Sequence, residues 1–339
     1  MSDYDGQRDS RGEWKPEEPP KPGPIFKWPP DPKGVFKFFF AAEGYFRPWN
    51  LLYLILAVVS TFFLTPSMER MVTFSFDWIA LIFLRNAAIL TLLAGGLHLR
   101  LYMKRKQGTK YKYSDKWLAA NDKKFLFKNQ TRDNVFFSIV SGCGIWTAYE
   151  AVTLWMYANK LIPYIDWNTN PVYFVFLLVV LLFIREVHFY LVHRLSHWKP
   201  LYKISHYLHH KNVNVGPWSG LAMHPIEHLL YFSGVLLHWV IPSHPVHAIA
   251  HLMHAGIAPA QGHSGFYRYI VKDNEDSAKQ RNIKADAYFH YIHHRFFTVN
   301  FGNEAVPLDK WFGSFHDGTP EAHAAMMERR KRIHQVTEA

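Results

Sequence analysis

The sequence predicts an all-α integral-membrane protein: a helical bundle of about four transmembrane helices plus a short or re-entrant hairpin, with a helical cap on the cytosolic face. Two observations lead to this fold class. The chain of 339 residues is 49% hydrophobic, yet its mean hydropathy is only -0.13, because strongly apolar segments alternate with charged ones. In addition, all but one of the 21 histidines follow Arg185, which concentrates one kind of chemistry in the last part of the chain.

The first 48 residues are predicted to form an N-terminal tail in the cytosol. Residues 1 to about 33 are polar and rich in proline, which favours an extended or disordered backbone over a packed core. No apolar stretch lies near the start, so we expect no cleaved secretory signal and expect the first apolar segment to insert as an anchor.

Four apolar segments then approach the ~20 residues that cross a bilayer, and they define a predicted transmembrane region at 49–187. The segments are 49–66, 76–99, 134–158 and 171–187. The basic loop from Arg100 to Arg132 should be cytosolic, so the fourth segment returns to the cytosol near Arg185. The location is therefore predicted to be multi-pass in a membrane, either a bacterial inner membrane or the endoplasmic reticulum.

The formal net charge of +11 raises the question of a nucleic-acid partner. The basic residues, however, directly follow an apolar segment, where they set topology and contact anionic lipid headgroups. We therefore expect the membrane as a partner, and no nucleic acid. The basic C-terminal tail, 320–339, is expected to be cytosolic for the same reason.

Two shorter apolar stretches, 226–241 and 245–258, are separated by three residues and predict the hairpin. It returns the chain to the cytosolic side, so that the last histidines can meet the earlier ones. Within it, a stripe of histidines at helical spacing either lines a lipid or proton path or packs against neighbouring helices. The stripe consists of His244, His247, His251 and His254.

Eight histidines fall into three short clusters whose spacing suits metal binding. Residues three or four apart share a helix face, so each cluster can present its imidazoles to one side. The clusters are His193 and His197; His206, His209 and His210; and His290, His293 and His294. Eight ligands are too many for one ion, so the cytosolic cap is predicted to hold a His-rich dimetal site.

Iron is the preferred metal because the surrounding helices are apolar and the sequence shows no evident hydrolytic nucleophile, whereas activation of O₂ toward hydrocarbon needs a redox metal. A non-redox zinc membrane protein, such as a hydrolase or a metal transporter, stays open as an alternative, as does a catalytically silent relative that binds lipid. The single cysteine, Cys143, excludes cysteine-based zinc or iron–sulfur sites.

From about Arg185 to Thr319 the sequence resembles the membrane-bound fatty acid hydroxylase and sterol desaturase superfamily. That family has H-x-x-x-H, then H-x-x-H-H, an intervening His-Pro, a lone histidine and a final H-x-x-H-H, and all occur here in this order. Further matches are Arg194, Leu201-Tyr202-Lys203, His224-Pro225-Ile226-Glu227, Gly262-His263-Ser264-Gly265, Asn300-Phe301-Gly302 and Leu308-Asp309-Lys310-Trp311-Phe312-Gly313. In the last element the Trp and Asp positions differ in order from the family's pattern.

The resemblance implies a catalytic region at 188–319 and adds His224 and His263 to the eight as metal ligands. It also implies two Fe ions, O₂ as co-substrate, and electrons from a separate redox partner, a ferredoxin- or cytochrome b-type carrier with an NAD(P)H reductase. We expect hydroxylation of an unactivated C–H bond of an acyl or polar lipid. The alternatives are a sterol or lipid desaturase, or a sterol C-methyl oxidase, with the same site.

Glu186 is a candidate for a catalytic or supporting role. It lies seven residues before His193 on the same helical face and is predicted to orient a ligand. The alternative is a charge at the membrane interface, paired with Arg185.

Overall fold

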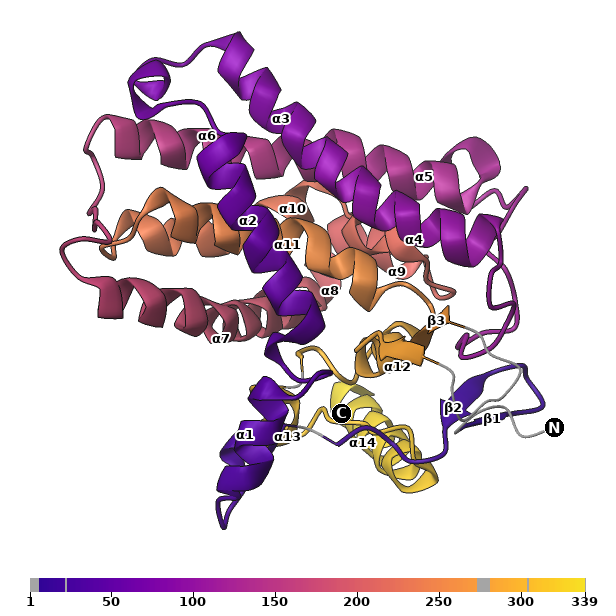
Figure 1. The fold of residues 1–339 in the computed structure, drawn as a ribbon. Coiled ribbons are helices and arrows are strands. Elements are labelled where there is room, and N and C mark those ends of the chain that lie inside the picture. Colours follow the sequence, from indigo (N-terminus) through magenta and orange to yellow (C-terminus); the bar gives the residue numbers. More distant parts are fainter. Residues whose placement is uncertain (1–5, 22, 273–280, 304, 339) are drawn as a thin grey trace.

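The computed structural model describes residues 6–21, 23–272, 281–303 and 305–338, and in these ranges the chain is mostly helical (Figure 1). Four helical spans are long and apolar enough to cross a membrane. They are Phe46–Phe63 (η2, Phe46–Asn50, and α2, Leu51–Phe63), Phe76–Met103 (α3, Phe76–Leu90; η4, Thr91–Gly95; α4, Gly96–His98; η5, Leu99–Met103), Gln130–Ala158 (α5, Gln130–Phe136; η7, Phe137–Cys143; α6, Gly144–Ala158) and α7, Pro171–Ser196. The four predicted transmembrane segments are thereby confirmed.

The span α7 is the element that carries the chain from the apolar bundle to the histidine clusters. It begins where the Asn170 side chain accepts a hydrogen bond from the Tyr173 N–H at 3.0 Å, with Pro171 in the first turn. It continues to Ser196, past the predicted end at 187. His193 therefore lies inside this helix, and His197 is the residue that caps its end.

The predicted hairpin is present, and it lies inside the bundle. It consists of α10 (Pro225–Phe232), η10 (Ser233–Trp239) and α11 (Pro245–Gly262). Helix α11 is largely buried and packs against α2, α3, α6 and α7, as Figure 1 shows. This placement brings His263, at the end of α11, to the same end of the bundle as the other histidine clusters.

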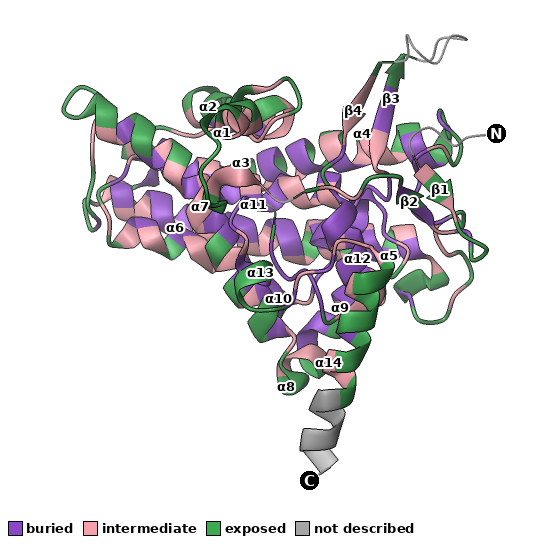
Figure 2. Ribbon diagram, turned by 90° about the horizontal axis from the view of Figure 1, so that it is seen from below, coloured by how far each residue is buried: buried purple, intermediate pink, exposed green. Residues whose placement is uncertain are grey.

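Many large apolar side chains on the four spans point outward, as expected for helices that face lipid. Examples are Phe62, Phe76, Leu84, Leu92 and Val172, which are between 62% and 86% exposed. By contrast, Figure 2 shows buried residues concentrated on α12 (Tyr288–Phe296) and α11, and exposed ones along the described part of α14 (Pro320–Glu338).

One short element, η3 (Met68–Met71), connects the first two spans. The remaining elements form the cap at the other end of the bundle. They are β1 (Gly6–Arg8), β2 (Trp14–Pro16), η1 (Pro24–Phe26), α1 (Pro32–Phe40), η6 (Leu126–Lys128), α8 (Lys199–Leu201), η8 (Tyr202–His206), α9 (Tyr207–His210), η9 (Pro217–Leu221), β3 (Arg268–Lys272), β4 (Arg281–Lys284) and α13 (Leu308–Trp311). The two antiparallel pairs, β1 with β2 and β3 with β4, were not predicted.

The expectation that the N-terminal residues lie outside any packed core is wrong for the segment around Trp14. Its side chain is 1% exposed and contacts the rings of Tyr111, Tyr113 and Tyr267. The neighbouring Glu13 pairs with Arg295, at 2.5 Å, on α12. One large aromatic side chain buries enough apolar surface to order a short polar segment around it, which the proline content alone did not reveal.

Candidate metal centre

Nine of the ten predicted ligands meet in the cap, and four segments bring them there. Helix α7 and its C-cap provide His193 and His197, and η8 with α9 provides the second cluster. The C-cap of α11 provides His263, and α12 provides the third cluster. Seven of these nine histidines are buried and the other two, His197 and His290, are half-buried, although the four segments lie far apart in the sequence.

The nitrogen atoms form two separate groups that could each hold an ion. In each group the candidate ligand atoms lie within 4.8 Å of one another. Group one is His193, His197, His206, His210 and His293; group two is His209, His263, His290 and His294. In group one, the Nε2 atom of His197 lies 3.0–3.1 Å from those of His206, His210 and His293. In group two, the Nε2 atom of His263 lies 2.9–3.3 Å from those of the other three.

The expectation that each cluster turns its imidazoles to one side needs a correction. His209 and His210 are neighbours in the sequence, yet they belong to different groups, and the same is true of His293 and His294. Successive side chains on a helix point about 100° apart. Two adjacent histidines can therefore extend into different groups. Both clusters thus bridge the two groups.

This arrangement fits metal ions better than hydrogen bonds among the imidazoles. A neutral imidazole has one N–H, so a single Nε2 atom cannot satisfy three others that surround it. Two metal–imidazole bonds of about 2.0–2.1 Å at octahedral or tetrahedral angles put their nitrogen atoms about 2.8–3.4 Å apart. The observed separations of 2.9–3.3 Å match that range.

Acceptors behind the rings fix the orientation of several histidines. The Nδ1 atom of His206 lies 2.6 Å from Oε1 of Glu227. Those of His193, His293 and His263 lie 2.7, 2.6 and 3.0 Å from the carbonyl oxygens of Phe301, Val299 and Pro259. A proton on Nδ1 that is donated to these oxygens leaves the Nε2 lone pair directed into the group, as a metal ligand requires.

The loop that offers two of these carbonyls is itself held by Asp309. Its carboxylate accepts hydrogen bonds from the N–H groups of Phe301 and Gly302, at 2.9 and 2.7 Å, and from the Ser314 hydroxyl at 2.6 Å. Asp309 belongs to the tail element whose order differs from the family's pattern. In this structure that element positions the residues that orient His193 and His293.

Burial keeps six of the imidazoles outside the transmembrane spans in their neutral form. Removal from water, followed by the neighbouring imidazoles, holds the pKa of His209, His210, His290, His293 and His294 well below its usual value. Burial lowers the pKa of His263 to about 4. Neutral imidazole is the form that binds a metal, so these residues need no deprotonation step at neutral pH.

His224 lies outside both groups. Its Nδ1 atom accepts a hydrogen bond from the Ile226 N–H at 3.3 Å, at the start of α10. In the His-Pro-x-Glu element, the residue that contacts the site is instead Glu227, which lies three residues after His224. Its carboxylate contacts the His206 ring. Sequence reasoning missed this partner, although the four-residue motif that contains it was the signal available.

Glu186 lies in the wall of a cavity beside group one. Its carboxylate accepts hydrogen bonds from the Tyr45 hydroxyl and from the Val306 N–H, both at 2.9 Å. It thereby ties the N-terminal segment and the loop after α12 to α7. The predicted role of orienting a ligand stays a prediction.

The histidine stripe of α11 packs against neighbouring segments. His247 donates from Nε2 to the Phe174 carbonyl at 2.9 Å, and His251 lies 3.3 Å from His238. His254 donates from Nε2 to Asn50 Oδ1 at 2.7 Å and also lines the cavity.

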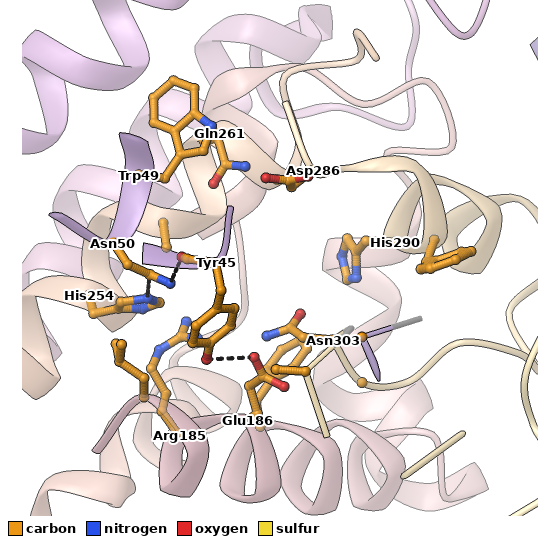
Figure 3. Close-up of a pocket in the computed structure, with 18 of the residues that line it drawn as sticks. Tyr45, Trp49, Asn50, Arg185, Glu186, His254, Gln261, Asp286, His290 and Asn303 are labelled. Carbon is orange, nitrogen blue, oxygen red and sulfur yellow. Dashed lines mark hydrogen bonds between the residues drawn. The ribbon is translucent and has the colours of Figure 1, made fainter. Parts of the chain in front are cut away.

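The cavity has a volume of about 970 Å³ and opens onto the two histidine groups. His193, His206, His209, His263 and His290 form part of its wall. Figure 3 shows His290 on one side, facing Tyr45, Asn50 and His254 on the other, with Arg185 and Glu186 below. The N-terminal residues that were predicted to be an unpacked tail complete the wall, which sequence reasoning did not foresee.

Comparison with known proteins agrees with this site. Residues 178–314 match the family model described as fatty acid hydroxylase. The matched segment contains all nine histidines, from the second half of α7 to the end of the Asp309 loop.

Several curated proteins are similar to this chain. A Delta(7)-sterol 5(6)-desaturase of Candida glabrata is 25% identical over 158 residues, 46% of this chain and 41% of that protein. One of Saccharomyces cerevisiae is 24% identical over 163 residues, 46% of this chain and 41% of that protein. A Delta(7)-sterol-C5(6)-desaturase of Nicotiana tabacum is 27% identical over 172 residues, 49% of this chain and 58% of that protein. The chain thus spans about two fifths to three fifths of these relatives. No solved structure gives a significant match.

Proposed function

From the membership of residues 178–314 in the fatty acid hydroxylase and sterol desaturase superfamily, we propose that this chain is an O₂-dependent, di-iron membrane oxidoreductase that hydroxylates an unactivated C–H bond of a lipid. The observation that carries the proposal is the convergence of nine imidazoles into two adjoining groups at the end of one cavity. Soluble di-iron bundles use carboxylates for this purpose; here neutral imidazoles take their place.

The nine histidines would hold one iron in each group, and bound iron supplies the redox chemistry that activates O₂ toward a C–H bond. The remaining work belongs to the protein. Glu227 and the carbonyls of Val299, Phe301 and Pro259 hold four imidazoles in position. The cavity places the lipid beside the groups, and burial within the cap limits access of water.

Several further features are part of this proposal. The spans at 49–187 anchor the chain, and the catalytic region at 188–319 faces the cytosol, where a separate electron carrier delivers two electrons. The orientation follows from the basic loop after the second span. Transport of metal is disfavoured because all nine clustered imidazoles lie in two groups at one end of the bundle, and two buried charges within the spans, Arg85 and Glu150, pair with each other.

Desaturation is the second candidate, because the similar curated proteins are sterol desaturases. The two reactions share their metal ligands and the loss of a first hydrogen from one carbon; hydroxylation then adds oxygen to that carbon, whereas desaturation removes a second hydrogen from the adjacent carbon. The position of the lipid decides between them. The experiment below separates the two outcomes by product mass.

The test is metal analysis and spectroscopy of the detergent-purified full chain, followed by addition of a chemical reductant, O₂ and a membrane lipid extract. About two irons per chain and a product heavier by one oxygen support the hydroxylase; a product lighter by two hydrogens supports the desaturase. The double variant His209→Ala, His293→Ala removes one ligand from each group and serves as the control. Stoichiometric zinc after anaerobic growth with excess iron, together with no O₂ consumption, would contradict the redox function.

A further inference from the structure

Among the described residues that line the cavity, each acidic side chain already has a partner. Glu227 pairs with His206, and Glu186 accepts from Tyr45 and Val306. Glu43 pairs with Arg268 at 2.7 Å, and Asp286 pairs with Lys284 at 2.7 Å. These four carboxylates are therefore not available to a cationic ligand.

Four lysines of the same wall are in the opposite situation. Lys21, Lys27, Lys37 and Lys310 are exposed and line the outer part of the cavity, and within the described residues none of them forms an ion pair with a carboxylate. Positive charges that line one cavity repel one another, and an anion bound between them relieves this repulsion.

Arg185 brings a fifth positive charge to the inner wall. It is 7% exposed, and its Nη2 donates to the Tyr231 hydroxyl at 2.9 Å. Its Nε has no hydrogen-bond partner, and no carboxylate of the described residues forms an ion pair with it. A buried cation without a counter-charge is unfavourable, so this group is poised for an anionic ligand. Figure 3 shows Arg185 rising from α7 into the cavity that His290 borders.

We propose that the lipid bound in this cavity carries an anionic headgroup of the phosphate type, which the lysines at the opening attract and Arg185 binds beside the metal groups. This inference rests on the proposed function only in taking the cavity as the place of the lipid. It assigns the substrate class: an anionic acyl lipid, whose oxidised carbon lies near the headgroup. A neutral sterol brings no charge to complement Arg185 or the four lysines.

The experiment measures binding by native mass spectrometry of the full chain in a neutral maltoside detergent. The probes are dodecyl phosphate and dodecylphosphocholine, which share a chain and a phosphate and differ in net charge. We expect dodecyl phosphate to bind at least about tenfold more tightly, since a charge-assisted hydrogen bond to a buried group changes affinity by that order. Neither O₂ nor reductant is present, so the result is independent of whether the protein oxidises lipid.

Two variants test the residues. Arg185→Gln should lose most of the preference for dodecyl phosphate. Arg185 is buried, so its variant could misfold. The triple variant Lys27→Gln, Lys37→Gln, Lys310→Gln changes only exposed residues and provides a second test. Its affinity for dodecyl phosphate should fall several-fold. Its matched control is Lys104→Gln, Lys106→Gln, Lys123→Gln, which removes the same charge from exposed residues outside the cavity and should bind like the unmodified chain.

Three results would overturn the proposal. The first is equal affinity for the two probes. The second is an equal loss in the cavity and control triple variants, which would indicate a general charge effect on the micelle. The third is inorganic phosphate binding as tightly as dodecyl phosphate, which would make this a site for the free anion instead of a lipid.

Discussion

His206 Nδ1 lies 2.6 Å from Oε1 of Glu227, and both side chains are buried. The two residues are 21 positions apart, on η8 and α10. A carboxylate behind a metal-binding imidazole fixes its tautomer and makes it a stronger ligand. Glu227 is therefore the partner through which the short α10 helix supports group one.

Replacement of this carboxylate tests the relationship. Glu227→Gln keeps the size of the side chain but removes its charge, and it should weaken iron binding about 10–100-fold. Competition with a chelator, followed by iron analysis, measures this change. Glu328→Gln, at a side chain that is 61% exposed, is the matched control and should retain iron like the unmodified chain; equal iron retention in both variants would argue against the role of Glu227.

The two groups should lose their metals separately. His197→Ala removes the imidazole at the middle of group one, and His263→Ala does the same in group two. Each variant should retain about one iron per chain, because the ligands of the other group remain. Iron analysis with Mössbauer spectroscopy distinguishes the two sites. His224→Ala should keep both irons, since His224 lies outside the groups; loss of an iron there would restore His224 as a ligand.

The N-terminal segment should contribute to stability through one side chain. Trp14→Ala empties a site that is 1% exposed, and such a change costs about 3–5 kcal/mol of unfolding free energy. Trp28→Ala makes the same chemical change at a side chain that is 87% exposed, where the expected effect is within about 0.5 kcal/mol. Thermal unfolding in detergent compares the two. Similar melting temperatures for the two variants would show that the packing of Trp14 does not contribute to the stability of the fold.

Buried Lys112 should make stability depend on pH. Burial, followed by the charge of Arg8, lowers the pKa of Lys112 from 10.5 to about 7, while its Nζ donates to the carbonyls of Ser114 and Lys116 at 2.8 and 2.7 Å. Between pH 7 and 10.5 the unfolded chain then binds more protons than the folded one, so stability rises with pH in this window.

Lys112→Met removes the titrating group, and its melting temperature should change less between pH 7 and 9.5 than that of the unmodified chain. The exposed Lys123→Gln is the control and should keep the full dependence. The prediction fails if all three proteins show the same slope of melting temperature against pH.

Local pattern in the sequence determined the transmembrane spans and the candidate ligands. Length and hydropathy decide whether a helix crosses a bilayer, so the spans required no knowledge of neighbours. The i, i+3 and i+4 spacing of the histidines likewise indicated metal ligands before any contact was known. The resemblance to a family added His263, which its own short motif could not have identified by spacing.

Only the tertiary structure decided which candidate ligand belongs to which of the two groups. His209 and His210 serve different groups because adjacent side chains on a helix diverge, and no linear pattern states which direction leads to which group. The carbonyl of Phe301 supports His193 from 108 positions away, and Trp14 packs on rings near residues 111 and 267. Such contacts depend on how distant segments fold together, because the free energy of burial depends on the neighbours that a residue finds and not on its place in the chain.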